Sequence, residues 1–190
     1  MAPRKALLIT YYWPPAGGGG VQRWAKFVKY FRDFGWEPVV YAPDQSELPG
    51  KDESMVDDIP ENIKTIRHPI WEPYGWYKKF MGIKKDEKTY SGFLHLKKQS
   101  AFQKYVVYWI RGNLFIPDAR RFWIRPSVKV LKKWLAENEV DAIITNGPPH
   151  SVHLIGLHLK QATGLPWLAD FRDPWTTIDF RHKLPMTPYA

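Results

Sequence analysis

The sequence of 190 residues contains no cysteine, which excludes disulfide bonds and thiolate metal sites. It has no apolar run near the roughly 20 residues that a membrane-spanning helix needs. Its first residues lack the apolar core and cleavage site of a secretory signal. These absences predict a soluble, cytoplasmic protein. Hydrophobic residues make up 44% of the chain, which is enough for one domain and cramped for two.

The formal net charge of the chain is +9, and the excess of basic over acidic residues lies in the middle of the chain. Residues 1–60 carry 7 Lys and Arg against 8 Asp and Glu, residues 61–140 carry 17 against 7, and residues 141–190 carry 4 against 4. The basic middle also contains Trp71, Trp76, Trp109 and Trp123. The pattern therefore indicates a local basic and aromatic patch, and not the uniformly basic surface typical of nucleic-acid binders.

Short apolar runs alternate with amphipathic segments along the chain. Strands are predicted at residues 6–11, 37–42, 65–68, 141–145 and 166–170. Helices are predicted from residue 21 to a stop at Gly35, at residues 126–138, and from residue 149 to a stop at Gly164. Residues 69–124 have no clean period apart from a helix near residues 100–110, so we expect a helical insertion there. The alternation predicts an α/β fold: a Rossmann-like open parallel sheet with helices on both faces.

Unusual residues follow three of these strands, where ligands of open parallel sheets bind. The first strand runs into Gly17, Gly18, Gly19 and Gly20. Bare glycine backbone before a helix suits a phosphate or a sugar hydroxyl. No Lys-Ser/Thr pair follows and the third glycine of the dinucleotide fingerprint is missing, which excludes both common phosphate motifs. The alternative is a flexible turn, against which the two flanking prolines argue.

The other two strand ends carry polar and charged residues. Asp170, Arg172 and Asp173 could orient or deprotonate an incoming hydroxyl, or could equally form a salt-bridged turn that braces the loop. Asn146, His150 and Ser151 belong either to a binding site or to a turn that caps the next helix. His150, His153 and His158 share one segment, but without cysteine or a nearby acidic residue we expect no metal site.

In this order the three segments resemble the amino-terminal domain of a family 4 glycosyltransferase with the GT-B fold. They are residues 11–23 (YYWPPAGGGGVQR), 145–151 (TNGPPHS) and 168–175 (LADFRDPW). Residues 115–118 (FIPD), followed by Trp123, resemble the bacterial subgroup that carries the last of these elements. The resemblance covers essentially the whole chain. The set is fairly specific, although each motif alone is weak.

The resemblance implies an enzyme of two Rossmann-like domains that transfers a sugar from a nucleotide-sugar to an acceptor hydroxyl with retention of configuration. It implies no cofactor and no metal ion, because basic groups and helix ends stabilise the departing diphosphate. The donor would bind mainly to a carboxyl-terminal domain, and residues 1–190 would form the acceptor-side domain. By itself this domain is expected to be inactive. The pathway implied is cell-surface or polysaccharide biosynthesis, with a sugar or lipid-linked acceptor.

The resemblance also distributes roles among the residues at the three strand ends. Contacts with the donor's diphosphate and sugar are expected from Gly17, Gly18, Gly19, Gly20 and Val21. Catalytic roles are expected for Asp170, Arg172 and Asp173. Acceptor contacts are expected from Arg23, Asn146, His150 and Ser151.

The basic and aromatic segment at residues 61–140 has three interpretations. It could rest on an anionic membrane at the inner face of the cell membrane and so reach a lipid-linked acceptor. It could equally be a solvated helical face. In a different class of function, it could make the chain a non-catalytic nucleic-acid-binding module that stacks bases and neutralises phosphates. The absence of any known nucleic-acid motif argues against the last interpretation.

Overall fold

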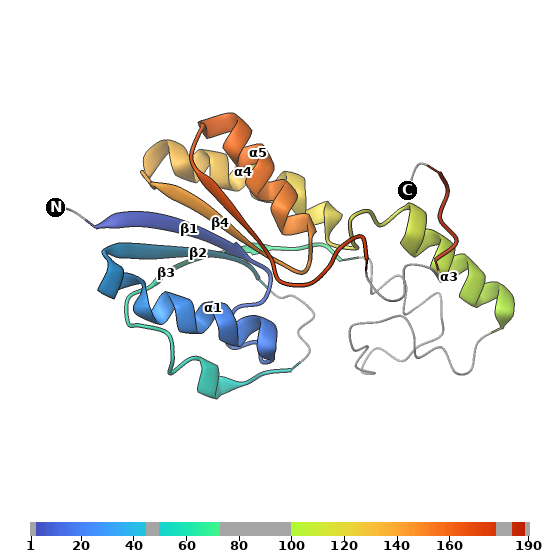
Figure 1. Ribbon diagram of the computed structural model, residues 1–190, viewed down its shortest axis with the longest axis horizontal. Helices are drawn as coiled ribbons and strands as arrows, with labels where there is room; N and C mark the ends of the chain where they lie inside the picture. The colour runs from blue at the N-terminus through green and yellow to red at the C-terminus, as the bar shows by residue number, and fades with distance from the viewer. Residues whose placement is uncertain (1–2, 45–49, 73–99, 178–183, 189–190) are drawn as a thin grey trace.

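The computed structural model describes residues 3–44, 50–72, 100–177 and 184–188 (Figure 1). Its centre is a five-stranded parallel sheet with the strand order β3-β2-β1-β4-β5. The strands are β1 (Arg4–Thr10), β2 (Trp36–Asp44), β3 (Lys64–Pro69), β4 (Ala142–Gly147) and β5 (Trp167–Phe171). Each predicted strand is present, and the prediction of an open parallel α/β sheet is confirmed.

Helices cover both faces of this sheet (Figure 1). One face carries α1 (Gly19–Tyr30), which continues into the short 3-10 helix η1 (Phe31–Phe34). The other face carries α4 (Arg121–Glu137) and α5 (Ser151–Thr163). Beyond the carboxyl ends of the strands lies α3 (Ala101–Asn113), and the remaining element is the 3-10 turn η2 (Glu53–Met55). The helices on both faces bury the sheet, which explains the continuous apolar runs of the central strands.

The core has two layers, one on each side of β1. Leu7 and Ile9 face α4 and α5, whereas Ala6 and Leu8 face α1, as expected when successive side chains of a strand alternate. The predicted glycine stops at Gly35 and Gly164 both adopt the left-handed conformation, with φ of 76° and 74°. The core therefore fixes the sheet, and the strand ends on which function was predicted lie at one edge.

Helix α4 begins at Arg121, before the predicted start at Pro126, and contains that proline in its interior. An interior proline costs roughly 3 kcal/mol in a helix. Burial offsets this cost here, because Trp123 and Ile124 in the first turn join the core, and Trp123 stacks on Tyr41 with ring centroids 5.4 Å apart. The insertion, predicted at residues 69–124, therefore ends before α4 begins at Arg121. Among the described residues of the insertion, α3 is the helix.

The placement of Trp123 corrects the prediction of an aromatic surface patch. Its indole is completely buried, so it cannot stack on a base or a membrane. Trp71 and Trp109 are exposed, on different parts of the chain, and Trp76 lies outside the described residues. The aromatic spacing in the sequence thus mixes core with surface, which weakens the nucleic-acid interpretation.

Candidate functional site

The carboxyl ends of β1, β4 and β5 lie side by side. In the sheet Thr10 is the partner of Asn146, and Asn146 is the partner of Asp170. The strand order reverses at β1, because β2 and β3 lie on one side of it and β4 and β5 on the other. Ligands of doubly wound sheets bind at such a switch point. The topology therefore brings the three predicted segments to one edge.

The loop between β1 and α1 is held at several points before it reaches its exposed glycines. The Gly17 amide donates to the Gly50 carbonyl at 3.0 Å, and the Asp52 amide donates to the Pro15 carbonyl at 2.9 Å. From β3, Arg67 donates to the Pro14 carbonyl at 2.7 Å. These bonds argue against a flexible turn and show that the amide of Gly17 is already used.

The next three amides are bare. Gly18 has φ 104°, and a Cβ at Gly18 or Gly19 would have no heavy atom within 4 Å. Within the described residues, no hydrogen bond is made by the amides of Gly18, Gly19 and Gly20, whereas the Val21 amide donates to the Gly18 carbonyl. Val21 itself belongs to the core. The first turn of α1 thus offers free N–H groups and the positive end of its dipole.

A guanidinium lies beside these amides. A Cβ on Gly20 would lie 2.6 Å from Arg172 Nη1, so the absence of a side chain at Gly20 lets this guanidinium lie against the main chain. The other two nitrogens of Arg172 donate to Asp173, Nε to Oδ1 at 3.2 Å and Nη2 to Oδ2 at 3.0 Å. Positive charge from Arg172 and from the helix terminus therefore meets at one spot, which suits an anion.

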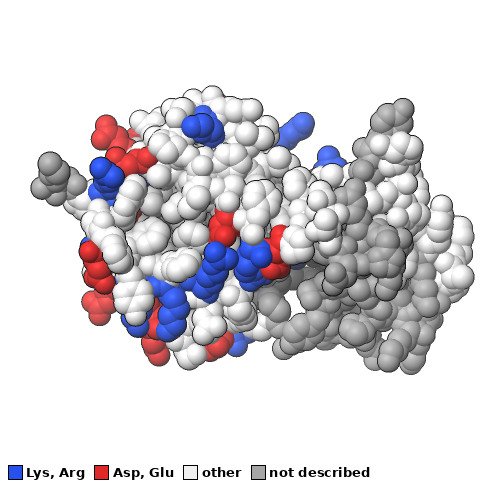
Figure 2. All heavy atoms as spheres, viewed as in Figure 1, with Lys and Arg blue, Asp and Glu red and all other residues white. Residues whose placement is uncertain are grey.

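Asp170 contacts α1 from the adjacent strand end. Its carboxylate accepts a hydrogen bond from Trp24 Nε1 at 2.8 Å and forms an ion pair with Arg23 at 3.1 Å. It therefore braces α1 against β5, while the Arg172–Asp173 pair forms a separate contact. Figure 2 shows basic and acidic side chains next to one another on this face. The Trp24 contact was missed because its partner is 146 residues away.

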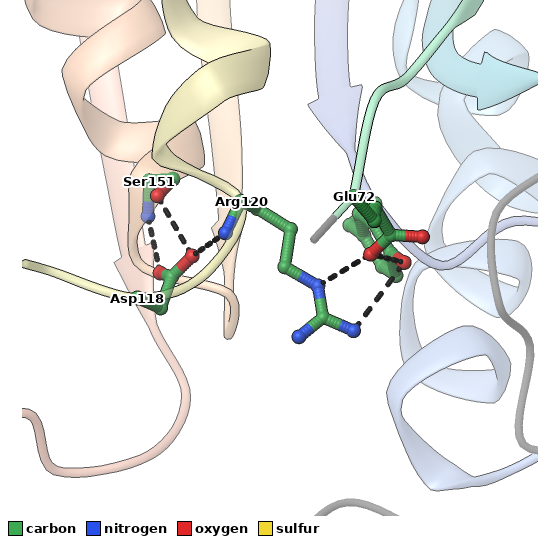
Figure 3. A network of polar contacts seen from close by, with 5 residues as sticks. Glu72, Asp118, Arg120 and Ser151 are labelled. Carbon is green, nitrogen blue, oxygen red and sulfur yellow. Dashed lines mark hydrogen bonds and ion pairs between the residues drawn. The ribbon is translucent and has the colours of Figure 1, made fainter. Parts of the chain in front are cut away.

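The end of β4 separates the predicted acceptor residues into two groups. Asn146 is 3% exposed and donates to Thr10 Oγ1 at 3.2 Å, and its Oδ1 has no partner in the described part of the chain. Ser151 is fully buried, and its amide and hydroxyl both donate to Asp118 at 2.8 Å (Figure 3). Within the described residues Asn146 Oδ1 thus remains unpaired at the switch point, whereas the amide and the hydroxyl of Ser151 are both bonded to Asp118.

A buried polar network fixes the loop that precedes α4. Arg120 forms an ion pair with Glu72 at 3.0 Å, and the side chains meet in Figure 3. The Tyr11 hydroxyl donates to the same carboxylate at 2.7 Å. Burial raises the pKa of Tyr11, so this hydroxyl keeps its proton. The network ties the end of β1 to the segments after β3 and before α4, and so makes the edge of the sheet rigid.

His153 belongs to a second network, on the α5 side of the sheet, that was not predicted as part of the site. Its Nδ1 lies 2.9 Å from Thr145 Oγ1, and the Trp167 indole donates to that oxygen at 2.9 Å. Burial lowers the pKa of His150, and burial also lowers the pKa of His153, to about 4. The spacing of three residues on a helix could have indicated that both histidines share a face.

Within the described residues, no group of three or more acidic or histidine side chains is arranged to hold a metal ion. No helix in the same residues has both the length and the apolar character needed to cross a membrane.

The state of His153 leads to a prediction about stability. Because its pKa is about 4 in the folded chain and 6.5 ordinarily, the unfolded chain binds the proton first as the pH falls. The free energy of unfolding should therefore drop between pH 6.5 and pH 4, by about 3 kcal/mol at most. Urea titrations over pH 4.5–6.5 measure this slope above the range of most carboxylates. The variant His153→Gln should flatten the slope, and an unchanged slope would contradict the assignment.

Known proteins resemble the chain only weakly. No family profile and no curated protein matches the chain. Among solved structures, the C-terminal domain of a hydrogenase from Pyrococcus furiosus has 13% identity and a TM-score of 0.45, over 88% of this chain and 91% of that chain. MurG from Acinetobacter baumannii has 16% identity and a TM-score of 0.42, over 88% of this chain and 34% of that chain. This chain thus spans about a third of the MurG chain, and neither likeness identifies a family or an activity.

Proposed function

We propose that the chain is the acceptor-side domain of a retaining, family 4 type glycosyltransferase with the GT-B fold. The supporting observation is the combination of three bare glycine amides with Arg172 at the switch point of the sheet, where Asp170 and Asn146 also lie. The proposal joins this geometry to the sequence resemblance of the same three segments. The reaction is the transfer of a sugar from a nucleotide-sugar to a hydroxyl, in the biosynthesis of a surface polysaccharide.

In this proposal the diphosphate of the donor lies against Gly18, Gly19 and Gly20. Negative charge grows on the diphosphate as the bond to the sugar breaks, and donors that are already in place stabilise it without reorganisation. Arg172 Nη1 lies beside Gly20 and adds a full positive charge, while Asp173 holds the other side of the guanidinium. Gly17 and Val21 support the loop, because their amides are already bonded.

The acceptor hydroxyl lies between the ends of β4 and β5. Asn146 Oδ1 is buried and unpartnered within the described residues, so it can accept a hydrogen bond from this hydroxyl. Asp170 keeps α1 at a fixed distance from the strand end through Arg23 and Trp24. Positioning of this kind accounts for a large part of enzymatic rate enhancement. The nucleotide is assigned to a second, donor-binding domain, so residues 1–190 alone are expected to be inactive.

Substitution of Gly18 tests the proposed diphosphate site. In the complete gene product, Gly18→Val places a side chain over the bare amides at a φ that valine rarely adopts, and should lower nucleotide-sugar turnover at least about 100-fold. Gly164→Val is the matched control, because Gly164 also has positive φ and open space but lies at the end of α5. Turnover is measured as release of nucleoside diphosphate. Wild-type turnover by Gly18→Val would reject the assignment.

A membrane-bound acceptor is favoured by the outer face of α4. Five exposed basic residues lie within one third of the helix circumference, namely Arg121, Arg125, Lys129, Lys132 and Lys133. Phe122 is exposed on the same side and meets the exposed Trp71 ring edge-on at 4.8 Å. Basic residues beside exposed aromatic rings suit the surface of an anionic membrane. We therefore propose that this face brings the domain to a lipid-linked acceptor.

Vesicle sedimentation tests the membrane contact. The protein should bind vesicles containing phosphatidylglycerol and not vesicles of phosphatidylcholine alone. Each basic residue contributes about 1 kcal/mol near an anionic surface, so the double variant Arg125→Gln, Lys129→Gln should bind about 30-fold more weakly. The control is Lys26→Gln, Lys29→Gln on α1, whose charges are already paired with Asp58. Equal sedimentation with both kinds of vesicle would exclude this contact.

A further inference from the structure

Two large aromatic side chains are exposed at the carboxyl end of β5 and in the loop that follows it. Phe171 lies between Asp170 and Arg172 in the sequence and is 51% exposed, and Trp175 is 42% exposed. Their rings are nearly parallel, with an interplanar angle of 19° and centroids 6.5 Å apart. Both rings therefore offer apolar surface to a ligand.

Two histidine rings from the α5 side support this surface. His153 stacks beneath Phe171 with centroids 3.9 Å apart, and His150 stacks on Trp175 at 5.6 Å. The interplanar angles are 26° and 23°, so each histidine ring is nearly parallel to the aromatic ring on which it stacks. Because burial lowers the pKa of both histidines, the rings are neutral near pH 7. The support is therefore planar and uncharged.

The position of the two histidines leaves buried ring nitrogens without hydrogen bonds, which is energetically unfavourable. His150 Nδ1 and His153 Nε2 are buried and have no partner in the described part of the chain. Both nitrogens point at Gly147, where a Cβ would lie 3.3 Å and 2.5 Å from them. Glycine is thus required for the rings to fit over β4. Unsatisfied buried groups are rare in folded proteins and accumulate where function demands them.

We propose that Phe171 and Trp175 form the stacking platform for a pyranose ring of the acceptor. The C–H bonds on one face of a pyranose carry partial positive charge, which the negative face of an aromatic ring attracts. The Asp170 carboxylate contacts Trp24 and Arg23 on the α1 face, whereas Phe171 packs on His153 on the α5 face, as expected for successive residues of a strand. The platform therefore lies on the opposite face of β5 from Asp170.

His150 and His153 are positioning residues in this inference. Their nitrogens are buried beneath the platform, so they set the planes of the two rings and do not touch the sugar. The identification of the bound sugar as the acceptor rests on the proposed function. The platform itself requires only that a carbohydrate binds.

The test is a titration of the chain, labelled with ¹⁵N, with the methyl glycosides of glucose, galactose, mannose and N-acetylglucosamine. At least one glycoside should shift the indole signal of Trp175, and the shift should saturate at glycoside concentrations below roughly 0.1 M. This concentration is enough to saturate a site with a millimolar Kd. Trp175→Ala and Phe171→Ala should weaken this binding at least tenfold, measured on the backbone amide signals that the glycoside shifts in the wild type. The control Trp109→Ala removes an exposed indole on α3 and should have no effect.

A pair of variants tests the role of His150. His150→Phe keeps a planar ring beneath Trp175 and should retain binding, whereas His150→Leu has no ring and should lose it. His158→Leu, exposed on the same helix, is the control. The platform is overturned if no glycoside shifts the Trp175 signal, or if Trp175→Ala binds as the wild type does. Glycoside binding by the chain, with no nucleotide-sugar turnover by the complete gene product, would reject the proposed function alone. Turnover by the complete gene product, with no glycoside binding by the chain, would reject the platform alone.

Discussion

The parallel register of β1, β4 and β5 is the constraint on which the site depends. It places Thr10, Asn146 and Asp170 in a row, and it makes every loop that follows these strands emerge at the same edge. The register is strongly fixed, because a slip of one residue would move Leu7 and Ile9 from one core layer to the other. The hydrophobic core thereby determines the position of polar groups that contribute nothing to it.

Contacts across the edge turn this alignment into a fixed geometry. Trp24 and Arg23 join α1 to the end of β5 through Asp170, and Asp118 joins the loop before α4 to the first turn of α5. Contacts of this kind use up polar groups that would otherwise be candidates for chemistry, such as the Ser151 hydroxyl. Among the described residues, the groups without a hydrogen-bond partner at this edge are the amides of Gly18, Gly19 and Gly20, Arg172 Nη1 and Asn146 Oδ1. The polar groups that can bind a ligand at this edge are therefore those that the contacts between the elements leave unpaired.

Periodicity in the sequence was sufficient to predict the strands, the helices and the edge at which the three motifs meet. The start of α4 was not predictable from local pattern, because the burial of Trp123 outweighs the unfavourable interior Pro126. Hydrogen bonds between residues far apart in the sequence could not be predicted either. Trp24 and Asp170 are 146 residues apart, and Asp118 and Ser151 are 33 residues apart. Local patterns specify elements, whereas the assignment of single polar groups requires the packing that brings elements together.

In the proposed function the free amides of Gly18, Gly19 and Gly20 bind an anion. Titration of the ¹⁵N-labelled chain with inorganic pyrophosphate tests this binding, because the amide signals of these glycines report a new hydrogen bond. We expect saturable shifts of these three signals that weaken with added salt, while the signal of Gly164 stays unchanged. Shifts that are absent, or that are spread evenly over the basic surface, would contradict it.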